Sequence, residues 1–401
     1  MKFGLANIAA LCAALGNPQD SFPSVNVAGT NGKGSVTAMV DTALRAAGHR
    51  SGRYTSPHLQ RLEERFVIDG TEVAPGALDA AARRIRQAAV ALAASGGLAS
   101  LPTFFECTTA VAFDLFREAR VDIAVLEVGL GGRLDATNIV SPIAAAIVSI
   151  DFDHEEQLGH TLASIAAEKA GVIKPGIPVV CGPVPDEALD VIAAVCAERG
   201  ATLIRTDTDA GLARRIASMP MSLPGEHQQA NAAVAVGLLD AIDRDTSRGL
   251  RIGADAVRAG LATTVWPGRI ERFSHRGCPV LLDAAHNPAG ARALASYLRG
   301  TAPDGVTLVF GAMRDKAVRE MLTTLAPAVR SIVCTTAPSP RAMTAGELAV
   351  LARDAGLSAE EVPEPVDAIA RACAHNRMVV VAGSIFLIGP VREWLGRDIL
   401  R

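Results

Sequence analysis

The chain has 401 residues, of which 49% are hydrophobic and 20% charged, and its formal net charge is −3. A chain of this length can form two or three domains with separate cores, and this composition excludes a disordered protein. The small net charge gives no support to a nucleic-acid or membrane-surface partner, and the longest apolar runs are too short to cross a bilayer.

The first residues predict an amphipathic helix. Leu5, Ile8, Leu11, Cys12 and Leu15 recur at helical spacing on one face, which favours a helix of the folded protein over a signal peptide. The seven cysteines are scattered and form no CxxC pair, a pattern typical of reduced thiols in a cytosolic protein. We therefore expect a cytoplasmic protein, and we also expect a monomer.

Up to about residue 205, apolar runs alternate with alanine-rich amphipathic stretches. The predicted strands cover residues 24–27, 51–54, 122–127, 144–150, 178–181 and 202–205. The predicted helices cover residues 33–47, 76–94, 103–119, 161–171 and 186–199. Strands that alternate with helices form βαβ units, so we predict an α/β domain whose mostly parallel sheet is covered on both faces. A small hairpin over 65–73 is inserted into this series, and helices over 226–243 and 253–263 follow it.

The segment 264–269, which contains Trp266 and Pro267, interrupts this pattern. A second series of strands follows it, near residues 280–283, 307–310, 331–335 and 378–382, with helical patterns between them. We therefore predict one domain over 1–264 and a smaller α/β domain over 265–401.

A glycine-rich turn, Gly-Thr-Asn-Gly-Lys-Gly-Ser over residues 29–35, joins the first predicted strand to the helix after it. Backbone N–H groups and a helix N-terminus attract phosphate there, and Lys33 adds a mobile charge. The strict G-x-x-x-x-G-K-[ST] spacing is not met, because Val27 replaces the first glycine and Gly34 separates Lys33 from Ser35. An ordinary turn is the alternative, but the strand and helix around it favour a loop that binds a nucleoside triphosphate.

Glu127 ends the strand 122–127 and precedes the glycine-rich segment 128–138. A carboxylate buried at a strand end is costly unless it is paired or binds a metal, and a phosphate-loop protein needs an acidic partner for Mg²⁺. Arg133, Asp135 and Asn138 offer polar groups to a substrate. The alternative is a salt-bridged strand end before a flexible loop.

Other polar segments follow strands in the same half of the chain. Ser56 could coordinate a cation and His58 could touch phosphate, or both could belong to a simple proline-containing turn. Residues 149–154 offer further ligands, and Lys169 could point toward the sheet edge or neutralise the C-terminus of its helix.

Thr103 and Glu106 fit a capping box, which we prefer to a metal site. Between them, Phe104 and Phe105 could pack in the core, or one of them could stack on a flat ring.

Taken in this order, these motifs resemble the folylpolyglutamate synthase/dihydrofolate synthase family of the Mur ligase superfamily. The resemblance extends over nearly the whole chain, and its most specific segments are residues 27–35, 55–59, 127–138, 153–159, 168–174, 223–231, 266–269 and 283–288. Ala284 stands where glycine is expected, and Asp151 and Phe152 vary the residues before Asp153. The resemblance implies a phosphate-loop domain of the Mur ligase central-domain type and a smaller Rossmann-like C-terminal domain.

The resemblance also implies a reaction and its residues. ATP phosphorylates a carboxylate of dihydropteroate or a reduced folate, and the α-amine of L-glutamate attacks the acyl phosphate. Expected ATP contacts are Asn31, Gly32, Lys33, Gly34, Ser35, Asn231, Arg269 and Asp283. Expected Mg²⁺ ligands, for two ions, are Ser56, Glu127 and His154; expected contacts to the pterin are Leu134, Asp135 and Ala136. Expected catalytic residues are Lys33, His154 and Lys169, the last of which would be carbamylated by CO₂.

Three alternatives stay open at this point. A Mur-type peptidoglycan ligase shares the phosphate loop and the acyl phosphate, but residues 55–59 and 130–138 argue against it, and we expect no UDP-sugar domain ahead of the loop. A regulatory P-loop ATPase would hydrolyse ATP without a carboxylate acceptor. Lys169 could also be an unmodified lysine at a helix C-terminus.

Overall fold

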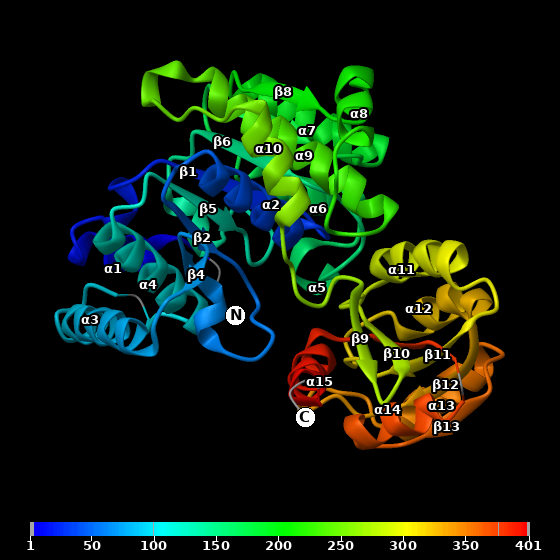
Figure 1. The fold of residues 1–401 in the computed structure, drawn as a ribbon. Coiled ribbons are helices and arrows are strands. Elements are labelled where there is room, and N and C mark those ends of the chain that lie inside the picture. Colours follow the sequence, from blue (N-terminus) through cyan, green and yellow to red (C-terminus); the bar gives the residue numbers. More distant parts are fainter. Residues whose placement is uncertain (1–3, 99, 376, 399–401) are drawn as a thin grey trace. The chain divides into compact units, whose positions relative to one another are not determined.

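A computed structural model describes residues 4–98, 100–375 and 377–398. It confirms the predicted α/β class, with two mostly parallel sheets (Figure 1). The chain divides into two compact units. The first unit runs to Ser222 and resumes over Gln228–Val265, and the second consists of Leu223–His227 and the chain from Trp266 onward.

The first unit contains an eight-stranded sheet in the order β4-β3-β2-β5-β1-β6-β7-β8. The strands are β1 (Ser24–Ala28), β2 (Ser51–Tyr54), β3 (Phe66–Ile68), β4 (Thr71–Glu72), β5 (Ile123–Glu127), β6 (Ala144–Ile147), β7 (Pro178–Cys181) and β8 (Thr202–Arg205). From β2 to β8 all neighbours are parallel, whereas β3 and β4 form the predicted antiparallel hairpin. Val27 of the central strand β1 pairs with Glu127. The phosphate loop and Glu127 therefore leave the sheet at one edge, where α/β proteins bind ligands.

Helices cover both faces of this sheet. They are α1 (Ala6–Ala14), α2 (Lys33–Ala46), α3 (Pro75–Ala94), α4 (Phe104–Ala119), α5 (Glu155–Leu158), α6 (Leu162–Ala170), α7 (Asp186–Glu198), α8 (Ala210–Ala217), α9 (Glu226–Arg244) and α10 (Ala254–Thr263). Val179 packs in the core of α6 and α7, while its neighbour Val180 lies against Gly237 of α9. Successive strand residues point to opposite faces, so β7 is buried on both sides, as expected for a parallel strand.

The second unit contains a six-stranded sheet in the order β13-β12-β11-β14-β10-β9. The strands are β9 (Glu271–His275), β10 (Cys278–Leu282), β11 (Val306–Phe310), β12 (Val329–Cys334), β13 (Ala359–Glu361) and β14 (Val379–Ala382). The helices are α11 (Pro288–Thr301), α12 (Val318–Leu325), α13 (Ala345–Asp354), α14 (Pro365–Cys373) and α15 (Ile385–Asp398). The β9 strand pairs antiparallel with β10, and the other pairs are parallel.

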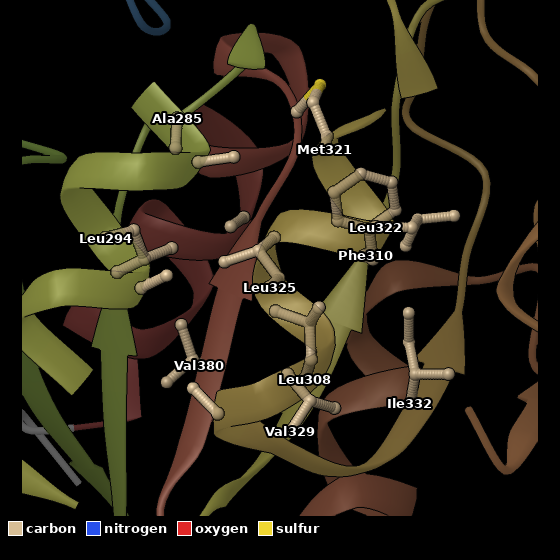
Figure 2. Close-up of a cluster of buried hydrophobic side chains, with 14 of the residues drawn as sticks. Ala285, Leu294, Leu308, Phe310, Met321, Leu322, Leu325, Val329, Ile332 and Val380 are labelled. Atoms are coloured by element: carbon tan, nitrogen blue, oxygen red, sulfur yellow. The ribbon is translucent and has the colours of Figure 1, made fainter. Parts of the chain in front are cut away.

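The core of the second unit lies between the sheet and its helices (Figure 2). Leu308, Phe310 and Val380 of the strands meet Leu294 of α11 and Met321 of α12, and all five are at most 1% exposed. Burial of each such side chain contributes roughly 1.5–3 kcal/mol. The end of β10, where Asp283 follows, is thereby held on a rigid sheet.

The structure corrects several predicted elements. The strand expected over 144–150 ends at Ile147, because Ser149 already bonds to the phosphate loop through its carbonyl oxygen and Thr30 N (2.8 Å). The strands β9 and β13 and the helices α5, α8 and α15 were not predicted. The two edge strands carry many polar residues and little apolar signal. The predicted first helix and the Thr103–Glu106 capping box are confirmed. None of the helices in the described part of the chain has the length and apolar character that a membrane span requires.

Candidate active site

The phosphate loop is held in shape by the segment that follows β6. The Ser149 hydroxyl accepts a hydrogen bond from Asn31 N and donates one to Asn31 O, both at 2.9 Å. Gly32 adopts φ 82° immediately before α2, a conformation that favours glycine. The N–H groups of the first turn of α2 therefore open onto the sheet edge, where they can bind an anion.

Two lysine amines meet at one carbonyl oxygen of this loop. Lys33 Nζ donates to Gly29 O (2.9 Å) and Thr30 O (3.1 Å), and Lys169 Nζ donates to the same Gly29 O (3.0 Å). Burial, assisted by the positive charge of Lys33, lowers the pKa of Lys169 to about 7, and Asp153 and Asp135 oppose this shift. Lys169 is 4% exposed, so it reaches the loop and not the solvent at the end of α6. The site carries positive charge that suits phosphate.

Glu127 lies beside Ser56 at the same edge. Its side chain is 5% exposed, and Oε2 accepts a hydrogen bond from Ser56 N at 3.1 Å. Arg53 lies on β2, three residues before Ser56. It donates to the buried Asp41 at 3.3 Å and raises the positive potential around Glu127. Burial lowers the pKa of Arg53, while Asp41 and Glu127 favour its charged form.

The third expected metal ligand, His154, is the N-cap residue immediately before α5, in the segment after β6. Its side chain is 44% exposed, and Asp153 Oδ1 accepts from its backbone N at 2.9 Å. Within the described ranges, no three His, Cys, Asp or Glu side chains form a ready-made metal cluster. Mg²⁺ keeps several waters and is bound by one or two carboxylates, so the Glu127 carboxylate beside Ser56 suits it without a larger set of protein ligands.

The Ser35 hydroxyl supplies the test of whether this edge fits a bound ion. Ser35 is 1% exposed, and among the described residues its Oγ has no hydrogen-bond partner. A buried hydroxyl without a partner is costly, and a phosphate oxygen or a cation would satisfy it. The residues therefore fit a nucleotide with its metal ion.

Asp135 organises the segment after β5. Its Oδ2 accepts from Gly129 N (3.0 Å) and Leu130 N (2.9 Å), and its Oδ1 accepts from Thr137 N (3.0 Å) and Thr137 Oγ1 (2.6 Å). Burial raises the pKa of Asp135, while these hydrogen bonds lower it. Leu134 is half-buried and Ala136 is buried beside it. Of the three residues expected to contact the pterin, Leu134 is therefore the one whose apolar side chain is partly exposed.

The same segment packs directly on the end of α6. A Cβ at Gly171 would lie 2.3 Å from Arg133 Cα, so only glycine permits this approach. Arg133 pairs with Glu168 at 2.7 Å, and Asn138 Nδ2 donates to Arg133 O and Gly171 O. The close packing at Gly171 and the Asn138 hydrogen bonds thus hold the segment against α6, and the Arg133–Glu168 ion pair lies at the exposed rim.

The two adjacent phenylalanines have different environments. Phe105 lies against Gly129 and packs on Tyr54 with ring centroids 6.1 Å apart, whereas Phe104 is 60% exposed. Arg65 lies 5.4 Å from the Phe104 ring centre and donates to His58 Nδ1 at 2.9 Å. Phe104 is the one with a free face for a flat ring. Burial and Arg65 lower the pKa of His58.

The second unit gathers the opposite charge at a strand end. Asp283 follows β10, is 7% exposed, and accepts from Ile270 N (3.0 Å) and Ala285 N (2.9 Å). Burial raises its pKa, while nearby Arg269 and His227 oppose the shift. The structure therefore brings together Arg269 and Asp283, both predicted ATP contacts. It adds His227, which belonged to a recognised motif but had received no role.

Asn231 of α9 reaches the phosphate loop within the first unit. A Cβ at Gly32 would lie 2.2 Å from Asn231 Oδ1, so the amide rests on the loop backbone. The resemblance placed Asn231 near ATP. Ser149 was considered only as a possible ligand and Gln228 had no role, whereas the structure shows them supporting the loop and this amide.

Comparison with known proteins places these features in a family. The dihydrofolate synthase/folylpolyglutamate synthase of Mycobacterium tuberculosis is 37% identical, covering 98% of this chain and 90% of that protein. The chain belongs to the folylpolyglutamate synthase/dihydrofolate synthase family. Residues 268–385 also match the model described as Mur ligase, glutamate ligase domain.

Solved structures of this synthase family share the fold. The Mycobacterium tuberculosis folylpolyglutamate synthase, complexed with ADP and AMPPCP, has a TM-score of 0.90 and 35% identity, covering 98% of this chain and 96% of that one. A bifunctional folylpolyglutamate synthase/dihydrofolate synthase with Mn, AMPPNP and L-glutamate bound has a TM-score of 0.84 and 33% identity, covering 99% and 95%.

The predicted family, fold class and enzyme class are thus confirmed: this chain is an ATP-dependent acid–amino-acid ligase of the synthase family. A regulatory ATPase and a peptidoglycan ligase no longer describe it.

Proposed function

We propose that this synthase-family chain joins L-glutamate to dihydropteroate, to reduced folates, or to both, through an acyl phosphate. The observation that carries the proposal is the meeting of the phosphate loop, Glu127 and Lys169 at one sheet edge. The names of the relatives and the ATP analogue, Mn and L-glutamate bound by solved members support the same substrates.

The chemistry follows from the unreactive carboxylate. An amine does not displace oxygen from a carboxylate, so the oxygen must first become a phosphate leaving group. We assign phosphate binding to the N–H groups of residues 31–35 and to Lys33, which would leave Gly29 O and Thr30 O for a phosphate oxygen. Asn231, Arg269 and Asp283 are assigned to other parts of ATP.

Ser56, Glu127 and His154 would hold Mg²⁺, and we propose two ions. The bound metal would offset the negative charge that collects on the transferring phosphoryl group. The buried Ser35 hydroxyl and the strand-end carboxylate of Glu127 support a cation here. His154 is also assigned a catalytic part, since its side chain is 44% exposed and a bound substrate could reach it.

Leu134, Asp135 and Ala136 are assigned to the pterin. Leu134 offers an apolar side chain, and the Asp135 carboxylate holds the backbone of the segment rigid, so the contact of Asp135 itself would come from its backbone. Phe104 is 60% exposed, and Arg65 lies 5.4 Å from its ring centre. This exposed ring supports an aromatic platform for a flat ring of the substrate.

Lys169 is proposed to carry a carbamate. Its pKa of about 7 leaves much of the amine neutral at neutral pH, and a neutral amine adds CO₂ to give a carbamate and a proton. The resulting anion would replace a buried ammonium beside Lys33 with an oxygen ligand that Mg²⁺ prefers. A ¹³C NMR spectrum of the protein equilibrated with ¹³C-bicarbonate should show a carbamate signal, and the Lys169→Met variant should lack it.

The decisive experiment is ADP release by the purified chain with ATP and Mg²⁺. We expect release that requires both L-glutamate and a pteroate- or folate-type acid. Equal release without either substrate contradicts the ligation reaction. Assaying dihydropteroate and tetrahydrofolate separately tests the wider proposal, because activity with one acid alone excludes a bifunctional enzyme.

A further inference from the structure

Gln228 and Asn231 stand three residues apart on α9, so they occupy one face of the helix. Both side chains are buried, with Gln228 1% and Asn231 7% exposed. Their amides bond directly: Gln228 Oε1 accepts from Asn231 Nδ2 at 3.0 Å. Two neutral amides are thus locked together in a place where water does not compete.

The bond determines which way the Asn231 amide faces. A side-chain amide has an acceptor oxygen and a donor nitrogen of nearly the same shape, and only its partners select one orientation. With Nδ2 held by Gln228, Oδ1 is directed at Gly32, where a Cβ would lie 2.2 Å away. Without that acceptor, the Asn231 amide could turn over and present a donor to the loop.

We propose that Gln228 is a positioning residue for nucleotide binding, acting through the Asn231 amide that it holds beside Gly32. This inference rests on the proposed contact of Asn231 with ATP. Because Gln228 acts through its hydrogen bond to Asn231, its effect should depend on the presence of Asn231.

The test is the dissociation constant of ADP for the full chain, measured by calorimetry. Gln228→Met keeps the length and burial of the side chain but removes the amide acceptor. Gln229→Met is the matched control, because Gln229 is the next residue on α9 and is exposed. We expect Gln228→Met to weaken ADP binding by roughly tenfold, the effect of an unpaired buried donor, and Gln229→Met to leave it unchanged.

A double-mutant cycle with Asn231→Ala separates the possible outcomes. Support requires that Gln228→Met has no further effect on ADP binding once Asn231→Ala is present. An undiminished effect in that background overturns the proposal, since Gln228 would then act on the nucleotide without Asn231. Normal ADP binding by Gln228→Met, or an equal loss in Gln229→Met, overturns it as well.

The same measurements distinguish this inference from the proposed function. If Asn231→Ala binds ADP as tightly as the wild type, the assignment of Asn231 fails and the role of Gln228 fails with it, while glutamate-dependent ADP release still tests the ligase reaction. If Asn231→Ala weakens binding and Gln228→Met does not, only the positioning role is lost. Gln228→Met should leave the KM for glutamate unchanged. A general disturbance of the fold would instead alter the binding of both substrates.

Discussion

The two sheets end in sites of opposite charge. In the first unit, two lysine amines share the Gly29 carbonyl oxygen; in the second, the carboxylate of Asp283 is buried behind two backbone N–H groups. Burial lowers the pKa of Lys169 and raises that of Asp283, so it drives both groups toward their neutral forms.

The difference lies in how each charge is compensated. Asp283 has Arg269 and His227 near it, in addition to its hydrogen bonds, so its site is largely complete. Lys169 has Lys33 as a repelling neighbour, and burial outweighs the opposing effect of Asp153 and Asp135, so its pKa falls to about 7. A bound phosphate, or a modification that removes the ammonium charge, would relieve this repulsion at the first edge.

Removing Lys33 should give the largest effect, because it breaks the positive edge. We expect Lys33→Ala to lower kcat/KM for ATP by about 10²–10³-fold, since the lysine stabilises charge on the transferring phosphoryl group. Lys33 is half-buried and its amine bonds to two carbonyl oxygens of its own loop, so we expect the melting temperature to change by no more than about 2 °C. Near wild-type turnover would contradict the phosphate-loop assignment.

Lys169→Met should separate activity from stability. The folded-state pKa of about 7 lies below the ordinary 10.5, so wild-type stability should rise with pH between these values, where the unfolded chain binds more protons. At pH 7 in CO₂-depleted buffer, the variant should be more stable by about 3 kcal/mol, because no buried ammonium must be neutralised. Denaturant titrations at several pH values measure this, and a flat wild-type profile would be the contrary result. Activity should fall together with the gain in stability.

Asp283→Asn tests the negative site of the second unit. We expect the KM for ATP to rise about tenfold, because one backbone N–H then faces an amide donor, with little change in the KM for glutamate. The raised folded pKa of Asp283 means that its contribution to stability declines as pH rises from its ordinary 3.8 through the folded value. The variant should lack this decline, and a decline as steep as that of the wild type would count against the assignment.

The smallest effect is expected for Arg133→Ala. Its ion pair with Glu168 is 2.7 Å long but 55% exposed on the arginine side, and solvent screens such pairs. We expect the free energy of unfolding to fall by less than about 1 kcal/mol. The dependence of stability on pH, which reflects the lowered pKa of Lys169, should stay as in the wild type. A loss of several kcal/mol would show that this pair, and not the close packing at Gly171, holds the segment on α6.

Much of the site was predictable because parallel strands deliver their following residues to one edge. The loop 29–35, Glu127 and the segment after β6 could be assigned to that edge from alternating strands and helices alone. The capping box at Thr103 was also predictable, since it is a local pattern that needs no tertiary contact. The edge strands β9 and β13 were not, because their alternation carries little apolar signal.

The amino-acid sequence by itself determined the α/β class, the phosphate loop and the family, because glycine spacing and apolar periodicity are local properties. Only the tertiary structure decided what each polar side chain does. It turned Asp135 inward to hold its own segment, directed Lys169 to the carbonyl oxygen that Lys33 also uses, and placed Gln228 behind Asn231. Burial and hydrogen-bond partners come from residues far apart in the chain, and they determine charge and orientation.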